Sequence, residues 1–187
     1  MVLLEMKKKV LRLIEEAAAE GSKKLTDDPD IELKLNDVIN QVMFEVARMK
    51  KIPARTTETI TVNDQEFELT SLDNFYQLGN IRFKDDYGLE REYNIFENFV
   101  DFPVTGTATF NYYKYPKRIT DETLDEDYKF ELSDDALEVI PYGVAADLLK
   151  SDVSNNYGQI YAERYETMLQ RLDPRYSMGS ITFEGGY

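Results

Sequence analysis

The chain has 187 residues, and 42% of them are apolar, which is enough for a real hydrophobic core in one domain or two small ones. It contains neither cysteine nor histidine, so disulfides and thiol chemistry are excluded, and the usual general base and commonest metal ligand are missing. The formal net charge of −14 argues against a protein that binds nucleic acid tightly. The apolar runs are too short to span a membrane.

The charge is unevenly distributed along the chain. Residues 119–187 contain 15 acidic and five basic residues, whereas residues 1–24 contain four acidic and six basic ones. An acidic surface keeps a protein soluble, and it also allows a polyanion to slide past without sticking. Both interpretations are compatible with this pattern.

The N-terminal part of the chain is expected to form two amphipathic helices. Apolar residues recur at helical spacing over about residues 2–20, where Gly21 is a suitable cap, and again over about residues 29–51. The second pattern begins with Asp28 and Pro29, a pair that is typical of a helix start. A basic cluster lies in the first helix: Lys7, Lys8, Lys9 and Arg12. It is either a solvated face or a contact with an acidic neighbouring subunit.

The character of the sequence changes in the middle of the chain. Alternating hydrophobicity predicts short strands over residues 57–62, 65–69, 75–84, 89–96, 99–102 and 107–115. The first two are expected to pair as a hairpin around Asn63 and Asp64, and Gly79 is a candidate bulge. Short strands at this spacing predict a small antiparallel sandwich or barrel. An acidic loop, Asp121 to Asp127, leads out of it.

Two further helical patterns follow. The first has an apolar stripe made of Leu137, Ile140, Val144 and Leu148. Pro141 lies within this stripe, so the helix is expected to kink or restart there. The second pattern spans residues 157–172, with Asn155 or Asn156 as its N-terminal cap and Asp173-Pro174 as its end.

These elements predict an α+β fold in which a four-helix bundle is built from both chain ends. An antiparallel β-sandwich or barrel is inserted between helices two and three, and an extended C-terminal tail follows. The expected divisions are residues 1–56 for helices one and two, 57–131 for the insertion, 132–174 for helices three and four, and 175–187 for the tail.

No pattern gathers catalytic or metal-binding side chains. The acids at positions 27, 28, 30 and 32 lack the central glycine and final glutamate of a calcium loop, and those at 125–127 lack a scaffold. Motifs for phosphate loops, dinucleotide sites and nucleophile elbows are missing. We therefore expect no enzyme, no cofactor and no metal site. A carboxylate-based hydrolase remains an alternative, which a deep pocket with two converging acids would reveal.

The chain contains 13 tyrosines, several of them close together. Tyr112, Tyr113 and Tyr115 lie on one predicted strand, and Tyr157, Tyr161 and Tyr165 form a stripe on the last helix. These rings either pack inside the molecule or form a subunit interface, where tyrosine is enriched. The residues that we expect at such an interface are Lys7, Lys8, Arg12, Tyr112, Tyr157, Tyr161 and Tyr165.

Several segments together resemble the head–tail connector proteins of tailed bacteriophages, the portal adaptors of the neck. The segment from Tyr112 to Pro116 (YYKYP), the acidic loop, and residues 132–149 with Ile140-Pro141-Tyr142 and Ala145-Ala146 are similar to the return from sandwich to bundle in that family. The opening VLRLIEE (residues 10–16) and the Asp-Pro-Asp before the second helix are also similar. The resemblance covers most of the chain, and its motifs are structural rather than catalytic.

This resemblance implies a virion protein that is made in the bacterial cytoplasm and forms a ring, expected to be a dodecamer, beneath the portal protein. The ring would extend the DNA channel, let genomic DNA pass without sequence-specific binding, and support the tail tube or a second neck ring protein. Connector proteins often hold the portal with a C-terminal arm. In this chain the expected docking residues are Tyr176, Met178, Ile181, Phe183 and Tyr187.

Two alternatives remain open. A β-sandwich with exposed tyrosines is also typical of a carbohydrate- or receptor-binding module of a virion, although such modules rarely need a helical base. Stopper and tail-completion proteins of the same neck are close alternatives that the sequence separates poorly from an adaptor.

Overall fold

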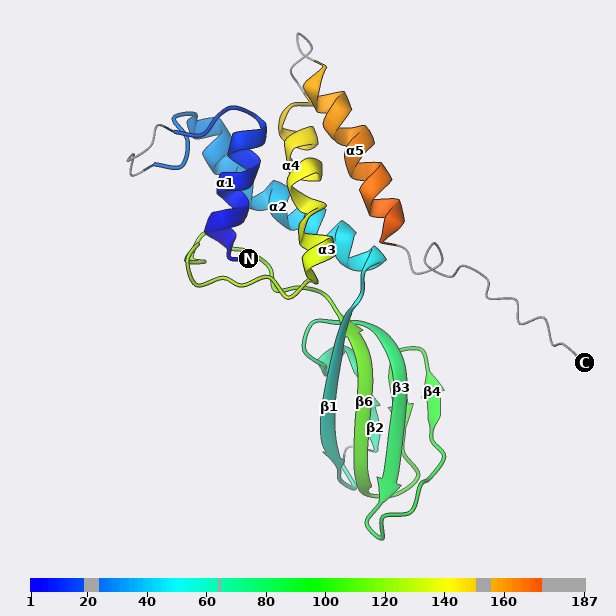
Figure 1. Cartoon of the computed structure of the whole chain (residues 1–187). Coiled ribbons are helices and arrows are strands. Elements are labelled where there is room, and N and C mark those ends of the chain that lie inside the picture. Colours follow the sequence, from blue (N-terminus) through cyan, green and yellow to red (C-terminus); the bar gives the residue numbers. More distant parts are fainter. Residues whose placement is uncertain (19–23, 64, 151–155, 173–187) are drawn as a thin grey trace, which may run out of the picture. The chain divides into compact units, whose positions relative to one another are not determined.

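The computed structural model describes residues 1–18, 24–63, 65–150 and 156–172 (Figure 1). The chain forms two compact units. One, called here the helical unit, combines Met1–Lys50 with Arg118–Tyr187, and the other, called the β unit, is the continuous segment Lys51–Lys117. The helical unit is therefore built from two stretches of chain that are separated by the β unit.

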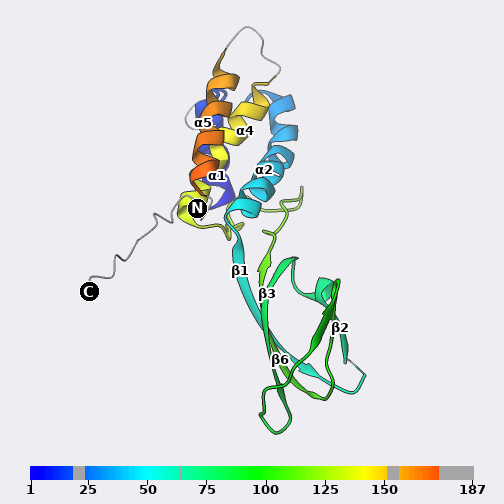
Figure 2. The same cartoon turned by 90° about the vertical axis from the view of Figure 1, so that its right-hand side faces the viewer.

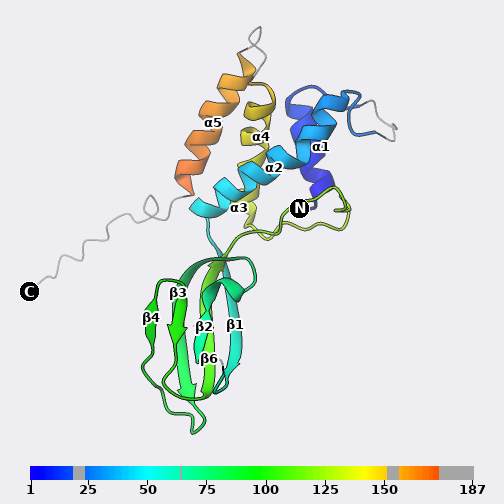
Figure 3. The ribbon, with the colours of Figure 1, turned by 180° about the vertical axis from the view of Figure 1, so that it is seen from behind.

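The described residues of the helical unit form five helices. They are α1 (Leu3–Leu13), α2 (Pro29–Met49), α3 (Asp134–Leu137), α4 (Ile140–Leu148) and α5 (Tyr157–Arg171). Helix α4 contacts α1, α2 and α5, and Figures 1 and 3 show it between α1 and α5. Its central place follows from its composition, because it is apolar nearly all round. The buried side chains of this unit include Leu3, Met6, Val10, Ile39, Met43, Val46, Ile140 and Val144.

Helix α1 ends earlier than the sequence pattern predicts. The expected helix over residues 2–20 stops at Leu13, because Glu15 adopts a left-handed backbone conformation with φ of 62°. The Glu16 N–H donates to the Leu11 carbonyl over 2.9 Å, and the Glu15 N–H donates to the Arg12 carbonyl over 3.4 Å. This pair of hydrogen bonds closes the helix end. Gly21, the expected cap, lies outside the described residues.

Other helix boundaries agree with the sequence. Asp28 caps α2 by accepting from the N–H groups of Asp30 and Ile31 over 2.8 and 3.3 Å, and Pro29 occupies the first turn. The predicted restart at Pro141 is confirmed, since α3 ends at Leu137 and Pro141 lies in the first turn of α4. Asn156 is the cap residue of α5.

The β unit contains two separate antiparallel sheets. The long sheet has the order β1-β6-β3, with strands Ile52–Ile60, Gly106–Lys114 and Phe75–Asp85. The short sheet has the order β2-β5-β4, with strands Glu66–Glu68, Phe99–Asp101 and Asn94–Phe96, and Figure 2 shows β2 in a different layer from the long strands. A short 3-10 helix, η1 (Leu69–Ser71), follows β2.

The predicted hairpin between residues 57–62 and 65–69 is wrong. Strand β1 pairs along its whole length with β6, from Ile52 opposite Lys114 to Ile60 opposite Gly106, and β2 pairs with β5. The predicted bulge is confirmed, because the pairing of β3 with β6 shifts register between Leu78 and Asn80. A Cβ atom at Gly79 would lie 2.8 Å from the Asn111 carbonyl oxygen, so this position needs glycine.

The predicted fold class is also wrong. Among the described residues the strands form two small three-stranded sheets that do not close into a sandwich or barrel, and the helices do not follow the order of the predicted four-helix bundle. The strands of the short sheet have only three residues each, so they cannot cover the long sheet. Three side chains outside the strands complete the hydrophobic core of the β unit: Leu69, Leu72 and Phe102.

A buried carboxylate organises the turn after β3. The Asp85 side chain accepts from the N–H groups of Tyr87 and Leu89 over 3.0 and 2.9 Å, and from Arg91 Nε over 2.7 Å. The hydrogen bond from Leu89 is the main cause that lowers the pKa of Asp85; burial opposes it, and Arg91 and Tyr87 lower the pKa further.

The substitution Asp85→Asn is expected to remove an acid-sensitive part of the stability of the β unit. Because the folded pKa is lowered, the carboxylate contributes fully above its ordinary pKa of 3.8 and loses this contribution as the pH falls through the lowered value. Thermal unfolding followed by circular dichroism at a series of acidic pH values measures it. As the pH falls, the wild type should lose thermal stability more steeply than Asp85→Asn. The exposed control Glu90→Gln should show the same pH dependence as the wild type. Equal slopes for wild type and Asp85→Asn would contradict this assignment.

Within the described residues, no helix is both long enough and apolar enough to cross a membrane.

Candidate functional site

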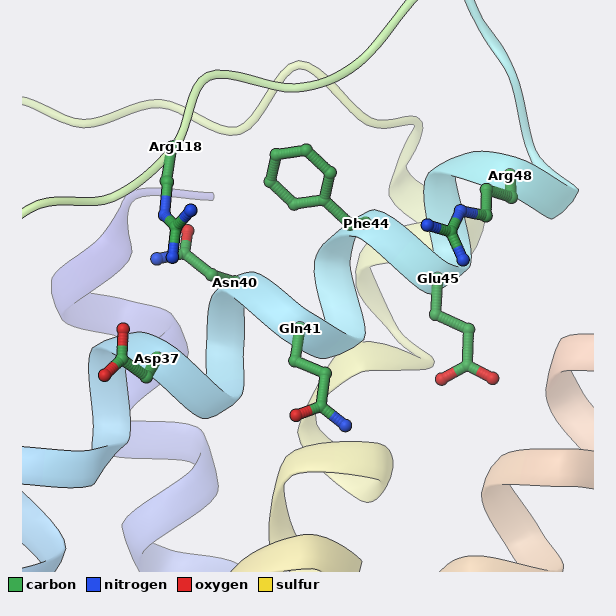
Figure 4. A pocket seen from close by; sticks show the side chains of 7 residues that line it. All are labelled: Asp37, Asn40, Gln41, Phe44, Glu45, Arg48 and Arg118. Carbon is green, nitrogen blue, oxygen red and sulfur yellow. The ribbon is translucent and has the colours of Figure 1, made fainter. Parts of the chain in front are cut away.

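A pocket of about 750 Å³ lies on the helical unit. It is called here the two-arginine pocket and is lined by Asp37, Asn40, Gln41, Phe44, Glu45, Arg48 and Arg118. Six of these residues recur along α2 at spacings of three and four, so they form one stripe of that helix. Figure 4 shows this stripe below the segment that carries Arg118.

Asn40 fixes the segment that carries Arg118. Its side chain is only 4% exposed, and it makes two hydrogen bonds to one residue. The Ile119 N–H donates to Asn40 Oδ1 over 2.8 Å, and Asn40 Nδ2 donates to the Ile119 carbonyl over 2.7 Å. The side chain of Asn40 thus ties the chain beside Arg118 to the middle of α2, and this places the guanidinium over the pocket.

The two arginines are exposed cations. Neither Arg48 nor Arg118 has a hydrogen bond or ion pair with any other described residue. Arg48 lies two turns along α2 from Asn40, a rise of about 12 Å, and Figure 4 shows Phe44 on the turn between them. The Phe44 ring is half-buried, and a free guanidinium lies towards each end of it. This arrangement can bind an apolar group that carries a carboxylate or phosphate on either side.

The acids of the pocket do not form a catalytic pair. Glu45 accepts a hydrogen bond from the Tyr165 hydroxyl over 2.8 Å, while burial, followed by Glu45 itself, raises the pKa of Tyr165. Asp37 lies eight residues earlier on the helix, about 12 Å along its axis, whereas paired glycosidase carboxyls lie roughly 5–9.5 Å apart. Figure 4 shows the two carboxyl groups pointing in different directions. The pocket therefore does not support the hydrolase alternative.

The predicted interface residues of α1 occupy different environments. Lys7 is buried, and its Nζ lies 2.8 Å from Asp125 Oδ1, so this cation is neutralised inside the helical unit. Lys8 and Arg12 are exposed. Lys9, the fourth member of the cluster, forms an ion pair of 2.7 Å with Glu138. Only Lys8 and Arg12 thus present free cationic groups to the solvent.

The predicted interface tyrosines are also separated. Tyr112 is buried in the core of the β unit, and Tyr165 is buried in the helical unit against Gly143. The Tyr161 hydroxyl donates to the Leu13 carbonyl over 2.8 Å, which links α5 to the end of α1. Tyr157 is 53% exposed, and its ring centroid lies 6.5 Å from that of Tyr161. Of the four, Tyr157 offers the most surface to a partner.

The docking residues expected in the tail, from Tyr176 to Tyr187, lie outside the described residues. Their role as a portal-binding arm stays a prediction.

Exposed apolar side chains mark two surfaces that sequence reasoning missed. The hairpin of β4 and β5 exposes Ile95, Phe96 and Phe99, with Phe96 at 70%. The acidic loop exposes Leu124 at 68%. Clustered apolar surface like that of the hairpin is typical of protein interaction sites. Alternation over residues 89–102 predicted strands there, but it did not indicate that Ile95, Phe96 and Phe99 would be exposed.

The two-arginine pocket was not predicted from the sequence either. Its cations come from segments far apart in the chain, and Asn40 is 79 residues from its partner Ile119. No single window of sequence contains the site. In the part of the chain that the structure describes, no group of acidic residues is arranged to hold a metal ion. No protein-family model matches this chain, and a comparison with curated proteins also finds no match.

Proposed function

We propose that this protein is a non-enzymatic structural subunit of a tailed-phage virion. It forms a ring at the neck, beneath the portal protein, and connects the capsid to the tail tube or to a second neck ring protein. The proposal combines the resemblance of the sequence to connector proteins with the surface of the helical unit. A dodecamer is the ring size that the resemblance implies.

One observation carries the proposal: the helical unit exposes two different and complementary surfaces. The two-arginine pocket offers free cations beside the Phe44 side chain. The loop Asp121–Asp127 offers carboxylates near Leu124 in the sequence. A closed ring needs such a pair, because each subunit contacts one neighbour with one surface and the other neighbour with a different one. A symmetric dimer would need a single self-complementary surface instead.

The overall charge suits a subunit that lines a DNA path. With a formal net charge of −14, the protein as a whole repels the phosphates of duplex DNA. Such repulsion would allow genomic DNA to move through a channel without being held. The place of action that we propose is therefore the neck of the virion.

The test of this function is assembly on the portal. Purified protein at micromolar concentration is expected to be small when alone and to form a ring when the portal ring of the same phage is added. Native mass spectrometry or mass photometry measures the mass of each species. A complex whose added mass is a whole number of subunits would support the adaptor role.

Two results would overturn the adaptor role. The first is a protein that never joins the portal at these concentrations. The second is a protein that joins purified tail-tube protein and ignores the portal, which would instead indicate a tail-completion role in the same neck.

A further inference from the structure

The acidic loop Asp121–Asp127 is anchored to the start of α1 by hydrogen bonds and an ion pair. The N–H groups of Leu3 and Leu4 donate to the carbonyls of Tyr128 and Asp125, each over 3.0 Å. Lys7 holds the Asp125 side chain over 2.8 Å. Figures 1 and 3 show this segment beside the start of α1. These contacts tie the loop to the N-terminal end of α1.

This anchoring sorts the side chains of the loop into two groups. Asp125 turns inward to Lys7, whereas Leu124 projects with 68% of its surface exposed. The N–H groups of Asp127 and Tyr128 both donate to the Leu124 carbonyl over 3.1 Å, so a tight turn presents this leucine. Four exposed acids flank it in the sequence: Asp121, Glu122, Glu126 and Asp127. The loop therefore presents an exposed leucine with carboxylates before and after it in the sequence.

The two-arginine pocket has an apolar ring with cations near it, and its own acids are Asp37 and Glu45, the latter bound to the Tyr165 hydroxyl. Phe44 offers an apolar surface. Arg48 lies one turn further along α2, and Arg118 lies on the other side of Phe44, on the segment above Asn40. Arg118 precedes the loop by only three residues, yet none of the described carboxylates pairs with it. The cations are thus available to acids from another molecule. Guanidinium–carboxylate hydrogen bonds are among the stronger ones, and they add geometric specificity.

We propose that the acidic loop of one subunit docks in the two-arginine pocket of the next copy of this chain. Leu124 packs against the ring of Phe44, and Glu122 and Glu126 pair with the two arginines. Because the loop and the pocket are different surfaces, the contact repeats head to tail and closes into a ring. This inference rests on the proposed ring function and names the contact that builds it.

A charge-swap experiment tests the contact. In the pocket variant, Arg48→Glu and Arg118→Glu make the pocket acidic, and in the loop variant, Glu122→Lys and Glu126→Lys make the loop basic. Each variant alone places like charges together, so the protein concentration needed for assembly on the portal should rise about 100-fold or more. An equimolar mixture should restore assembly. The acidic loop of the pocket variant fits the native pocket of the loop variant, and the basic loop of the loop variant fits the acidic pocket of the pocket variant, so the two proteins can alternate.

The matched control reverses two exposed acids of the helical unit outside the loop, Glu16→Lys and Glu32→Lys. This variant changes the net charge as much as the loop variant and should assemble like wild type. Circular dichroism of every variant checks that it is folded. Both proteins still carry their substitutions in the mixture, so a folding defect would persist there. Restored assembly would therefore show that the loss in each variant alone came from the contact and not from misfolding.

The outcomes separate the contact from the ring function. If wild type assembles on the portal and both charge variants do so equally well, the docking contact is wrong and the ring function stands. The same conclusion follows if the variants fail alone and their mixture also fails.

If wild type never assembles on the portal, the ring function fails, and disulfide trapping decides the contact. The chain has no cysteine, so a mixture of Leu124→Cys and Gln41→Cys proteins can be oxidised at high concentration without background. A heterodimer that exceeds the yield with Glu32→Cys in place of Gln41→Cys supports docking. A yield no higher than that of the control overturns it.

Discussion

Replacing Phe110 by alanine is expected to lower the free energy of unfolding of the β unit by about 3–5 kcal/mol. The side chain is fully buried on the central strand β6, and its ring stacks on Phe67 with centroids 4.7 Å apart. Phe102 meets it edge-on at 6.2 Å. Truncation therefore removes aromatic contacts with the residues that join the short sheet to the long one, and it leaves a cavity that these three-residue strands cannot fill.

Urea unfolding measures this effect, with near-ultraviolet circular dichroism of the tyrosines as the signal. The matched control is Phe96→Ala, because Phe96 is 70% exposed on the short sheet and its loss should change the unfolding free energy by about 0.5 kcal/mol or less. Phe110→Leu should fall in between, since it keeps most of the volume. If Phe96→Ala were as destabilising as Phe110→Ala, the core would not lie where the structure places it.

Replacing Asn40 by alanine is expected to destabilise the helical unit by about 2–4 kcal/mol, because it leaves the N–H and carbonyl of Ile119 without partners in a buried place. Asn40→Asp should keep the hydrogen bond from the Ile119 N–H, because a carboxylate oxygen still accepts from it. The bond to the Ile119 carbonyl should be lost, because the carboxylate places an acceptor opposite another acceptor. Helical circular dichroism during urea unfolding reports the change.

Gln41→Ala is the control for this prediction, because Gln41 is the exposed neighbour of Asn40 in the same pocket. Its effect should stay within about 0.5 kcal/mol. If Asn40→Ala unfolded at the same urea concentration as Gln41→Ala, the two hydrogen bonds to Ile119 would contribute nothing measurable, and Arg118 would need another means of support.

Local chemistry explains which elements could be predicted from the sequence. Asp28 and Pro29 act within one helical turn, and Pro141 blocks a helix by its own ring, so these boundaries follow from neighbouring residues. The end of α1 was missed because Glu15 occupies a left-handed position that usually takes glycine. No pattern in the sequence marks a glutamate for that role.

Long-range pairing explains what could not be predicted. Asn63 suggested a hairpin between neighbouring strands, yet β1 finds its partner in β6, and this choice depends on packing across the whole β unit. The same limit applies to the site. Tyr165 was expected at an interface, but its hydroxyl meets Glu45 from a helix 120 residues away, and Arg118 joins α2 only through Asn40.

The antiparallel pairing of β1 with β6 has a consequence for how the chain folds during synthesis. Helices α1 and α2 leave the ribosome long before α4, which supplies the centre of their shared core. The β unit is continuous in sequence, so it has all its contacts available first. Once Ile52 lies opposite Lys114, the two ends of the inserted segment are neighbours. The helices that follow then meet α2 across a short connection, and the entropy of closing a long loop no longer opposes them.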